Sequence, residues 1–300
     1  MAYALERSET ATMAIRRIAT EEIDEALADL SGDTDRTAGE AVHDCRKRCK
    51  KVRALLNMVR PSLGRRYARA TARVREAARE LSGARDAQAL ADAFATTTQG
   101  RTDSPLVAPV AAGLQRRADA AAAEFEAMTD HVMRASALLT KVHGGIDEWR
   151  LSEDGWEAIG PGIVDNYRSG RKELARARTD PTATQLHDWR KRVKGYWYHV
   201  RLLHDAAPTV LGPLGGALSD LSDDLGVAHD LAVLDDLLAA HPGEFGGDDP
   251  VRLARCLVAE RRAMLETHAI HQGAVLYVES PRRFGERLHA YWELWQDGSE

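Results

Sequence analysis

The sequence predicts an all-α protein built from two similar halves. Apolar residues recur at intervals of three and four along most of the 300 residues, which is the spacing of a buried helix face. Alternating runs of Val, Ile and Thr, which are typical of strands, are almost missing. A basic segment that begins at residue 43 occurs again from residue 187, so the chain contains an internal repeat.

Glycine and proline residues divide this helical pattern into segments. Thr37 and Glu40 have the spacing of a capping box at the start of the second helix. Asp180 and Pro181 predict another helix start, and Gly226 predicts a break. The predicted helices cover residues 12–30, 39–60, 62–81, 84–98, 106–141, 161–178, 182–206, 210–225, 229–240, 250–272 and 281–296.

The repeat involves two motifs that share one spacing. The segment His43–Lys50 (HDCRKRCK) matches His187–Lys194 (HDWRKRVK) at an offset of 144 residues, and the same offset superimposes Leu81–Asp86 on Leu225–Asp230. Two separate motifs seldom share an offset by chance. We therefore expect two similar helical bundles, residues 1–143 and 163–300, joined by a connection over 144–162.

Charge is strongly segregated along the chain, although the net charge is only −5. Between His43 and Arg79 there are thirteen Arg and Lys residues against two acidic ones, a local balance of +11. Between Leu202 and Val251 there are ten acidic residues and no Arg or Lys. Because like charges at such density repel one another, the basic block indicates a localised anion site.

The basic residues form stripes on the predicted helices, opposite apolar faces. On the first motif helix, Asn57 joins the stripe and Val42, Cys45 and Cys49 lie on the opposite, buried face. The cations and histidines of the first stripe are His43, Arg46, Lys47, Lys50 and, at its edge, Arg53. The second stripe has His187, Arg190, Lys191, Lys194 and Arg201, and the helix after Pro61 adds Arg65, Arg66, Arg69 and Arg73.

These stripes differ from ordinary solvated helix faces, which mix charges of both signs. Five of the seven lysines lie in the two motif helices, whereas the chain has thirty-four arginines. Lys supplies a compact charge and Arg a planar fork, a combination suited to phosphate oxygens. Histidines at the head of each stripe could donate to the same oxygens. We expect Asp44 and Asp188 to pair with Arg48 and Arg192 at i+4.

Several other classes of protein are disfavoured. No apolar run is long enough to span a membrane, and the N-terminal residues do not form a signal peptide. Three cysteines without metal-ligand spacing fit reduced thiols in a cytoplasm. Neither a serine-nucleophile motif nor a phosphate loop is present, so we expect no catalytic residues, no cofactor and no resident metal.

One alternative function is metal-dependent hydrolysis. His-Asp dipeptides at 43–44, 187–188 and 229–230 occur also in HD-type phosphohydrolases, which are all-α. A divalent cation would be repelled by the neighbouring Arg and Lys side chains. Asp223, Asp224, His229 and Asp230 are the remaining candidates for a cation site, and we interpret them as a solvated acidic face.

Another alternative is RNA binding, because aromatic residues interleave with a basic helix at Gly195–Tyr198. The helical wheel places Tyr196 in the core and only Tyr198 on the basic stripe. The first repeat has no aromatic residue in its motif helix, which suits a backbone-only polyanion better than a nucleic acid.

The motifs His43–Lys50 and His187–Lys194, with Leu81–Asp86, Leu225–Leu234 and Ser280–Trp292, resemble the conserved histidine α-helical domain (CHAD) family. The resemblance covers nearly the whole chain. It implies one domain of two four-helix bundles, related by pseudo-twofold symmetry, with a basic groove or pore between them. It also implies non-catalytic binding of inorganic polyphosphate and association with polyphosphate granules.

The resemblance assigns polyphosphate-binding positions to both motif helices and to two further segments. In the second repeat, Gly195 and Trp197 replace basic residues, so this repeat should bind phosphate less tightly than the first. Basic residues ahead of the second motif and near the C-terminus complete the set. The assigned residues are His43, Arg46, Lys47, Lys50, Arg53, His187, Arg190, Lys191, Lys194, Arg168, Arg171, Lys172, Arg282 and Arg283.

Overall fold

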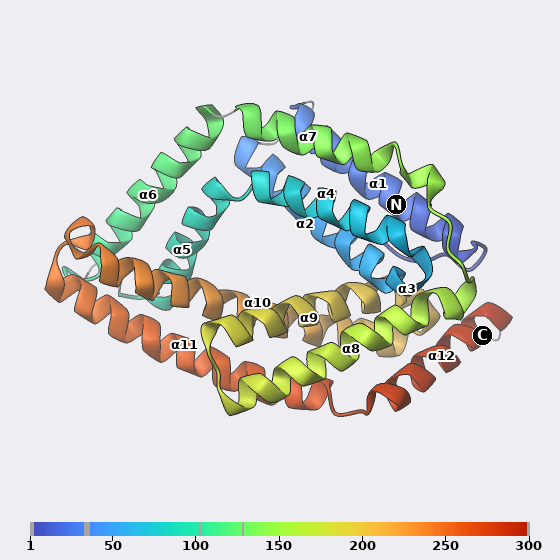
Figure 1. Cartoon of the computed structure of the whole chain (residues 1–300). Coiled ribbons are helices and arrows are strands. Elements are labelled where there is room, and N and C mark those ends of the chain that lie inside the picture. Colours follow the sequence, from blue (N-terminus) through green and yellow to red (C-terminus); the bar gives the residue numbers. More distant parts are fainter. Residues whose placement is uncertain (1–2, 33–36, 102–103, 128, 299–300) are drawn as a thin grey trace.

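The computed structural model describes residues 3–32, 37–101, 104–127 and 129–298, and these form helices joined by turns, without a strand (Figure 1). This confirms the predicted all-α class. The α-helices are α1 (Ala11–Ser31), α2 (Ala38–Met58), α3 (Arg60–Leu63), α4 (Arg65–Glu80), α5 (Gly83–Thr97), α6 (Ala108–Ala127), α7 (Thr129–His143), α8 (Gly155–Thr179), α9 (Ala183–Leu202), α10 (Pro208–Ala240), α11 (Asp248–Leu276) and α12 (Pro281–Asp297). Short 3₁₀ helices cover Ile146–Glu148, His204–Ala206 and Pro242–Phe245.

Side-chain caps fix the starts of α2 and α9. Thr37 and Glu40 form the predicted capping box at the start of α2. At α9 the prediction was wrong by two residues, because the hydroxyl of Thr182, rather than Asp180, accepts from the backbone N–H of Gln185 at 3.3 Å.

Three further predictions of where helices begin or break were wrong. The segment 106–141 is two helices, α6 and α7, and Met128 between them lies outside the described residues. Helix α10 runs through Gly226 without a break, because a packed glycine inside a helix costs only about 1 kcal/mol. Helix α8 begins at Gly155 and contains Pro161, so part of the predicted connection 144–162 is helical. The division into two bundles, and their relation by a repeat, stay predictions.

Helices α1, α2, α4 and α7 pack on one another in the upper right part of Figure 1. Helix α1 lies against α2 and α7, and α4 lies against the same two helices from the other side. Their apolar faces belong to the larger core of the protein, which includes Ile18, Cys45, Leu55 and Val74. Burial of these faces follows the three-and-four spacing of the sequence.

Helices α5 and α6 leave this group and pack against the second half of the chain (Figure 1). They contact each other and helices α10 and α11, and they share a separate core with them. Phe94 and Val110 from the first half lie there with Leu231, Phe245 and Val258 from the second. Helix α5 is thereby held beside α10.

The two motif helices, α2 and α9, contact each other. The buried imidazole of His199 on α9 lies with Nε2 3.0 Å from the carbonyl oxygen of Ala54 on α2, and donates to it. A Cβ at Gly162 of α8 would overlap the carbonyl of Met58, so this glycine lets α8 approach α2 closely. These contacts set the distance between the basic stripes.

We expect His199 to make the protein less stable in acid. Burial lowers the pKa of His199 to about 4, so the unfolded chain binds a proton at a higher pH than the folded chain does. The contribution of neutral His199 to the free energy of unfolding is fully present above pH 6.5 and is lost as the pH falls toward 4. The total loss is on the order of 3 kcal/mol. Urea unfolding between pH 8 and 4.5 should show a shallower pH dependence for His199→Gln than for the wild type.

His204→Gln is the control for this experiment, since His204 is exposed on the neighbouring 3₁₀ helix. It should keep the wild-type pH dependence. An identical pH dependence for His199→Gln and the wild type would contradict the assignment.

Candidate functional site

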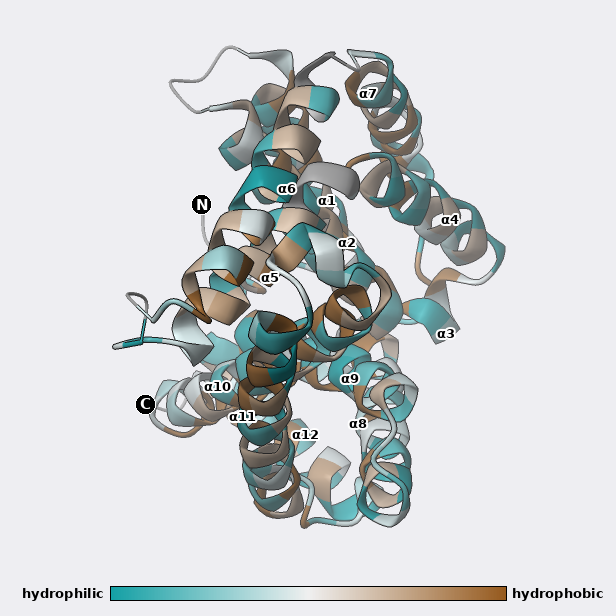
Figure 2. Ribbon diagram, turned by 90° about the vertical axis from the view of Figure 1, so that its left-hand side faces the viewer, coloured by the Kyte–Doolittle hydropathy of each residue, from teal (hydrophilic) through white to brown (hydrophobic). Residues whose placement is uncertain are grey.

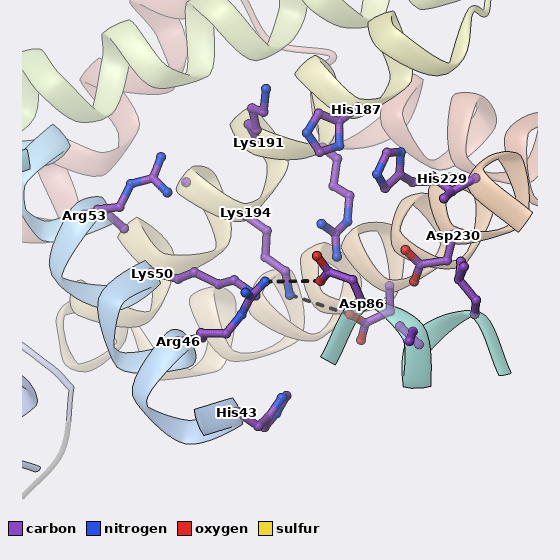
Figure 3. A pocket seen from close by; sticks show the side chains of 18 of the residues that line it. His43, Arg46, Lys50, Arg53, Asp86, His187, Lys191, Lys194, His229 and Asp230 are labelled. Atoms are coloured by element: carbon purple, nitrogen blue, oxygen red, sulfur yellow. Dashed lines mark hydrogen bonds and ion pairs between the residues drawn. The ribbon is translucent and has the colours of Figure 1, made fainter. Parts of the chain in front are cut away.

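A cavity of about 920 Å³ lies where α2 and α9 meet α5 and α10. Eight of the residues predicted to bind phosphate line it, and Figure 3 shows most of them pointing into the same space. Both motif helices contribute. The eight are His43, Arg46, Lys50 and Arg53 of α2, and His187, Arg190, Lys191 and Lys194 of α9.

Helical periodicity explains why these side chains share one space. On α2, Val42, Cys45 and Cys49 are buried in the core, as predicted, and the stripe lies opposite them. On α9, Trp189 and Val193 are buried in the same way. The contact between α2 and α9 then brings the two stripes together.

Backbone carbonyls and an aromatic ring hold three of the cations. Arg46 Nη1 donates to the carbonyl oxygen of Leu81 at 2.9 Å. Arg190 Nε donates to the carbonyl oxygen of Ser222 at 3.3 Å. Lys194 Nζ lies 4.6 Å from the ring centre of Trp197, a cation–π contact. These cations are therefore positioned before any ligand binds.

Gly226 allows one of these cations to lie against α10. A Cβ added at Gly226 would lie 2.8 Å from Arg190 Nη2 and 3.2 Å from Arg190 Nε. The residue that was expected to break the helix instead makes room for a guanidinium group.

Burial disfavours the charged forms of two cations of the cavity. It lowers the pKa of Lys194, with Asp223 acting in the opposite direction. Burial also lowers the pKa of Arg53, and the nearby Arg75 lowers it further. An anion in the cavity would relieve both effects.

His187 of α9 and His229 of α10 form a pair, with ring centres 4.4 Å apart. Burial lowers the pKa of His187 to about 4, and His229, Lys191 and Arg190 lower it further. The pKa of His229 is also lowered, first by burial. Nδ1 of each ring is buried without a hydrogen-bond partner among the described residues. Both rings are therefore neutral near pH 7.

Carboxylates also line the cavity, which the sequence analysis did not anticipate. Asp86 of α5 lies 3.5 Å from Arg46 (Figure 3). Asp223 of α10 lies 3.6 Å from Lys194. Asp223, His229 and Asp230 were expected to form a solvated acidic face; they line the cavity and face the basic helices, and the side chain of Asp223 is 67% exposed there. Asp86 and Asp230 occupy matching positions at the 144-residue offset of the two motifs. This shared spacing could have identified both as lining residues.

Three polar lining residues that were not predicted to bind phosphate are Asn57, Arg117 and Tyr198. Tyr198 lies on the basic side of α9 as expected, but it is only 4% exposed. Its burial raises its pKa to about 12. Its ring packs edge-on against Tyr3.

The predicted local ion pairs of the motif helices were wrong. Arg48 pairs with acidic residues of α1, among them Asp29 at 2.8 Å and Glu25 at 2.8 Å. Asp188 pairs with Lys191 at 2.8 Å rather than with Arg192. Arg48 thus pairs with the buried carboxylate of Asp29 on α1 instead of with Asp44 on its own helix.

Eleven predicted residues do not line the cavity. Arg65, Arg66 and Arg69 are exposed on α4, which is mostly hydrophilic in Figure 2, and Arg73 donates to the carbonyl oxygen of Lys141 at 3.0 Å. Lys47 is exposed on α2. The others in this group are Arg168, Arg171, Lys172, Arg201, Arg282 and Arg283.

Those six have other surroundings. Arg168 pairs with Asp165, and Arg171 donates to the carbonyl oxygen of Glu279. Arg201 lies over the rings of Trp197 and Tyr3. Arg282 pairs with Glu286 at 2.8 Å, while Lys172 and Arg283 are exposed.

Among the residues that the structure describes, no three His, Cys, Asp or Glu side chains gather as a metal ion requires. Nor does any described helix combine the length and apolar character needed to cross a membrane.

The histidine pair can be tested without a ligand. We expect His187 to titrate near pH 4 by NMR, and His229→Gln to raise its pKa, because a neighbouring charge that opposes protonation is removed. His271→Gln, an exposed histidine of α11, should leave the pKa of His187 unchanged. An unchanged pKa in His229→Gln would show that the rings do not interact.

Comparisons with known proteins agree with this architecture. The structure is similar to the crystal structure of the CHAD domain from the plant Ricinus communis, with a TM-score of 0.60 and 21% identity over 89% of this chain and 92% of that chain. It is also similar to PptA from Streptomyces chartreusis, with a TM-score of 0.54 and 14% identity over 94% of this chain and 99% of that chain. At these identities the likeness shows a shared fold.

A search of curated proteins found no match to this chain. The sequence model of the CHAD domain, in contrast, matches residues 17–239, which include both motif helices and the four helices that meet at the cavity. The chain therefore belongs to the CHAD domain family.

Proposed function

We propose that this protein binds inorganic polyphosphate in the cavity between α2, α5, α9 and α10, without catalysis, and that it associates with polyphosphate granules. The observation that carries the proposal is the meeting of two basic stripes in one cavity. Six Arg and Lys side chains from the two motif helices line it. Cations in such an arrangement can neutralise successive phosphates of a linear chain.

Two of the cations are held in place before a ligand binds, which supports tight binding. Arg46 and Arg190 are held by backbone carbonyls, so little side-chain freedom is lost when an anion arrives. Each further phosphate of a bound chain is already tethered near the next cation, so affinity should increase with chain length. A long chain could reach the exposed Arg65, Arg66 and Arg69 of α4.

The surroundings of the histidines and aromatic rings favour polyphosphate over the two alternatives. His187 and His229 lie beside Arg190 and Lys191, whose charges oppose a metal cation. Tyr198 is buried, and the ring of Trp197 is in contact with Lys194 and Arg201, so neither is a free platform for a base. Other phosphate-rich polyanions are possible ligands, whereas a specific nucleic-acid partner is not expected.

Removal of four lining cations should abolish tight binding. We expect the combined substitution of Arg46, Lys50, Arg190 and Lys194 by Ala to weaken long-chain polyphosphate binding by at least about a hundred-fold, because charge-assisted hydrogen bonds contribute roughly 1.5–3 kcal/mol each. Calorimetric titration at moderate salt measures this. Wild-type affinity should also fall steeply as the salt concentration rises, because binding releases the counter-ions that surround the phosphates.

The matched control removes four exposed basic residues away from the cavity: Arg101, Lys141, Arg150 and Arg178. It changes the net charge equally and should retain most of the affinity. Equal loss in both variants would reduce the proposal to an effect of total charge. Equally strong binding of single-stranded RNA to the wild type would contradict a preference for polyphosphate.

Gly226→Ala should separate stability from binding. An added Cβ favours the helix by up to about 1 kcal/mol, but it displaces the guanidinium of Arg190. We expect stability to be equal or higher and polyphosphate affinity to fall several-fold. Gly216→Ala on the same helix has open space at its Cβ, so it should leave affinity unchanged. Wild-type affinity in Gly226→Ala would show that Arg190 does not contact the ligand.

A further inference from the structure

The cavity that is proposed to bind an anion contains the protein's own anions. Asp86 on α5 and Asp223 on α10 line it together with the cations of α2 and α9. The distance from Asp86 Oδ1 to Arg46 Nη2 is 3.5 Å, and the distance from Asp223 Oδ1 to Lys194 Nζ is 3.6 Å. A phosphate bound to either cation would lie close to a carboxylate.

These carboxylates do not hold the cations in place. Arg46 is anchored by the carbonyl oxygen of Leu81 at 2.9 Å, a shorter contact than the one to Asp86. Lys194 packs over Trp197, and its side chain is only 24% exposed. Removal of the two carboxylates should therefore leave both cations where they are.

The carboxylates themselves are loosely held. The side chain of Asp86 is 68% exposed and that of Asp223 is 67% exposed. Both ion-pair distances exceed the roughly 2.7–2.9 Å of a charge-assisted hydrogen bond. Exposed pairs of this kind contribute little to stability, so each carboxylate can turn away from its cation toward solvent.

We propose that Asp86 and Asp223 are displaceable internal counter-ions that set the shortest phosphate chain the cavity retains. This inference rests on the proposed function. Each carboxylate is tethered near its cation at an effective concentration of about millimolar or more. A short phosphate chain gains few contacts when it displaces a carboxylate, so it stays weakly bound. A long chain gains enough contacts to remain bound after it has displaced both carboxylates.

The double variant Asp86→Asn with Asp223→Asn tests this inference, because it removes both charges and preserves side-chain shape. The probes are triphosphate and long-chain polyphosphate, titrated calorimetrically in magnesium-free buffer. We expect triphosphate to bind between about two-fold and thirty-fold more tightly, the range that two exposed ion pairs allow. At a fixed ligand concentration, shorter chains should become detectable.

The control variant is Asp92→Asn with Asp220→Asn, which changes exposed carboxylates on the same two helices, away from the cavity. Its net charge equals that of the test variant. Triphosphate affinity in this control should remain within about two-fold of the wild type, by analogy with the small effects of exposed charges.

Three outcomes would overturn the inference. If the wild type binds polyphosphate and the test variant binds triphosphate no more tightly than the control does, the counter-ion role is wrong and the proposed function stands. If the test variant binds more weakly only when Mg²⁺ is present, the carboxylates hold the divalent cations of the ligand instead. If the wild type binds neither probe, the proposed function fails, and the inference fails with it.

Discussion

The contact between α2 and α9 is the constraint on which the site depends. Both helices present basic stripes to one cavity, and those stripes repel each other. Buried apolar faces and the hydrogen bond from His199 to the carbonyl oxygen of Ala54 oppose this repulsion. Gly162 adds to the effect by letting α8 lie directly against α2. The charges are close because the core beneath them is well packed.

The same constraint explains the neutral and acidic groups of the cavity. Additional positive charge would raise the repulsion, and the His187–His229 pair avoids this by having lowered pKa values. Asp86 and Asp223 partly neutralise Arg46 and Lys194. Backbone carbonyls orient Arg46 and Arg190.

Sequence reasoning succeeded where the determining interactions are local. The buried positions Val42, Cys45, Trp189 and Val193 follow from spacing along one helix. It failed where a distant segment decides the outcome. Arg48 pairs with Asp29 of another helix, and α10 continues through Gly226, where the missing Cβ leaves room for Arg190.

By itself, the sequence determined the helical class, the buried and basic faces of α2 and α9, and the histidines and cations that each face carries. Tertiary structure decided which faces meet. Helices α5 and α6 cross to pack on α10 and α11, which brings Asp86 and His229 to the cavity, whereas Arg65 and Arg69 of α4 stay outside. Periodicity is a local property of a helix, but the meeting of two faces depends on contacts between residues more than a hundred positions apart.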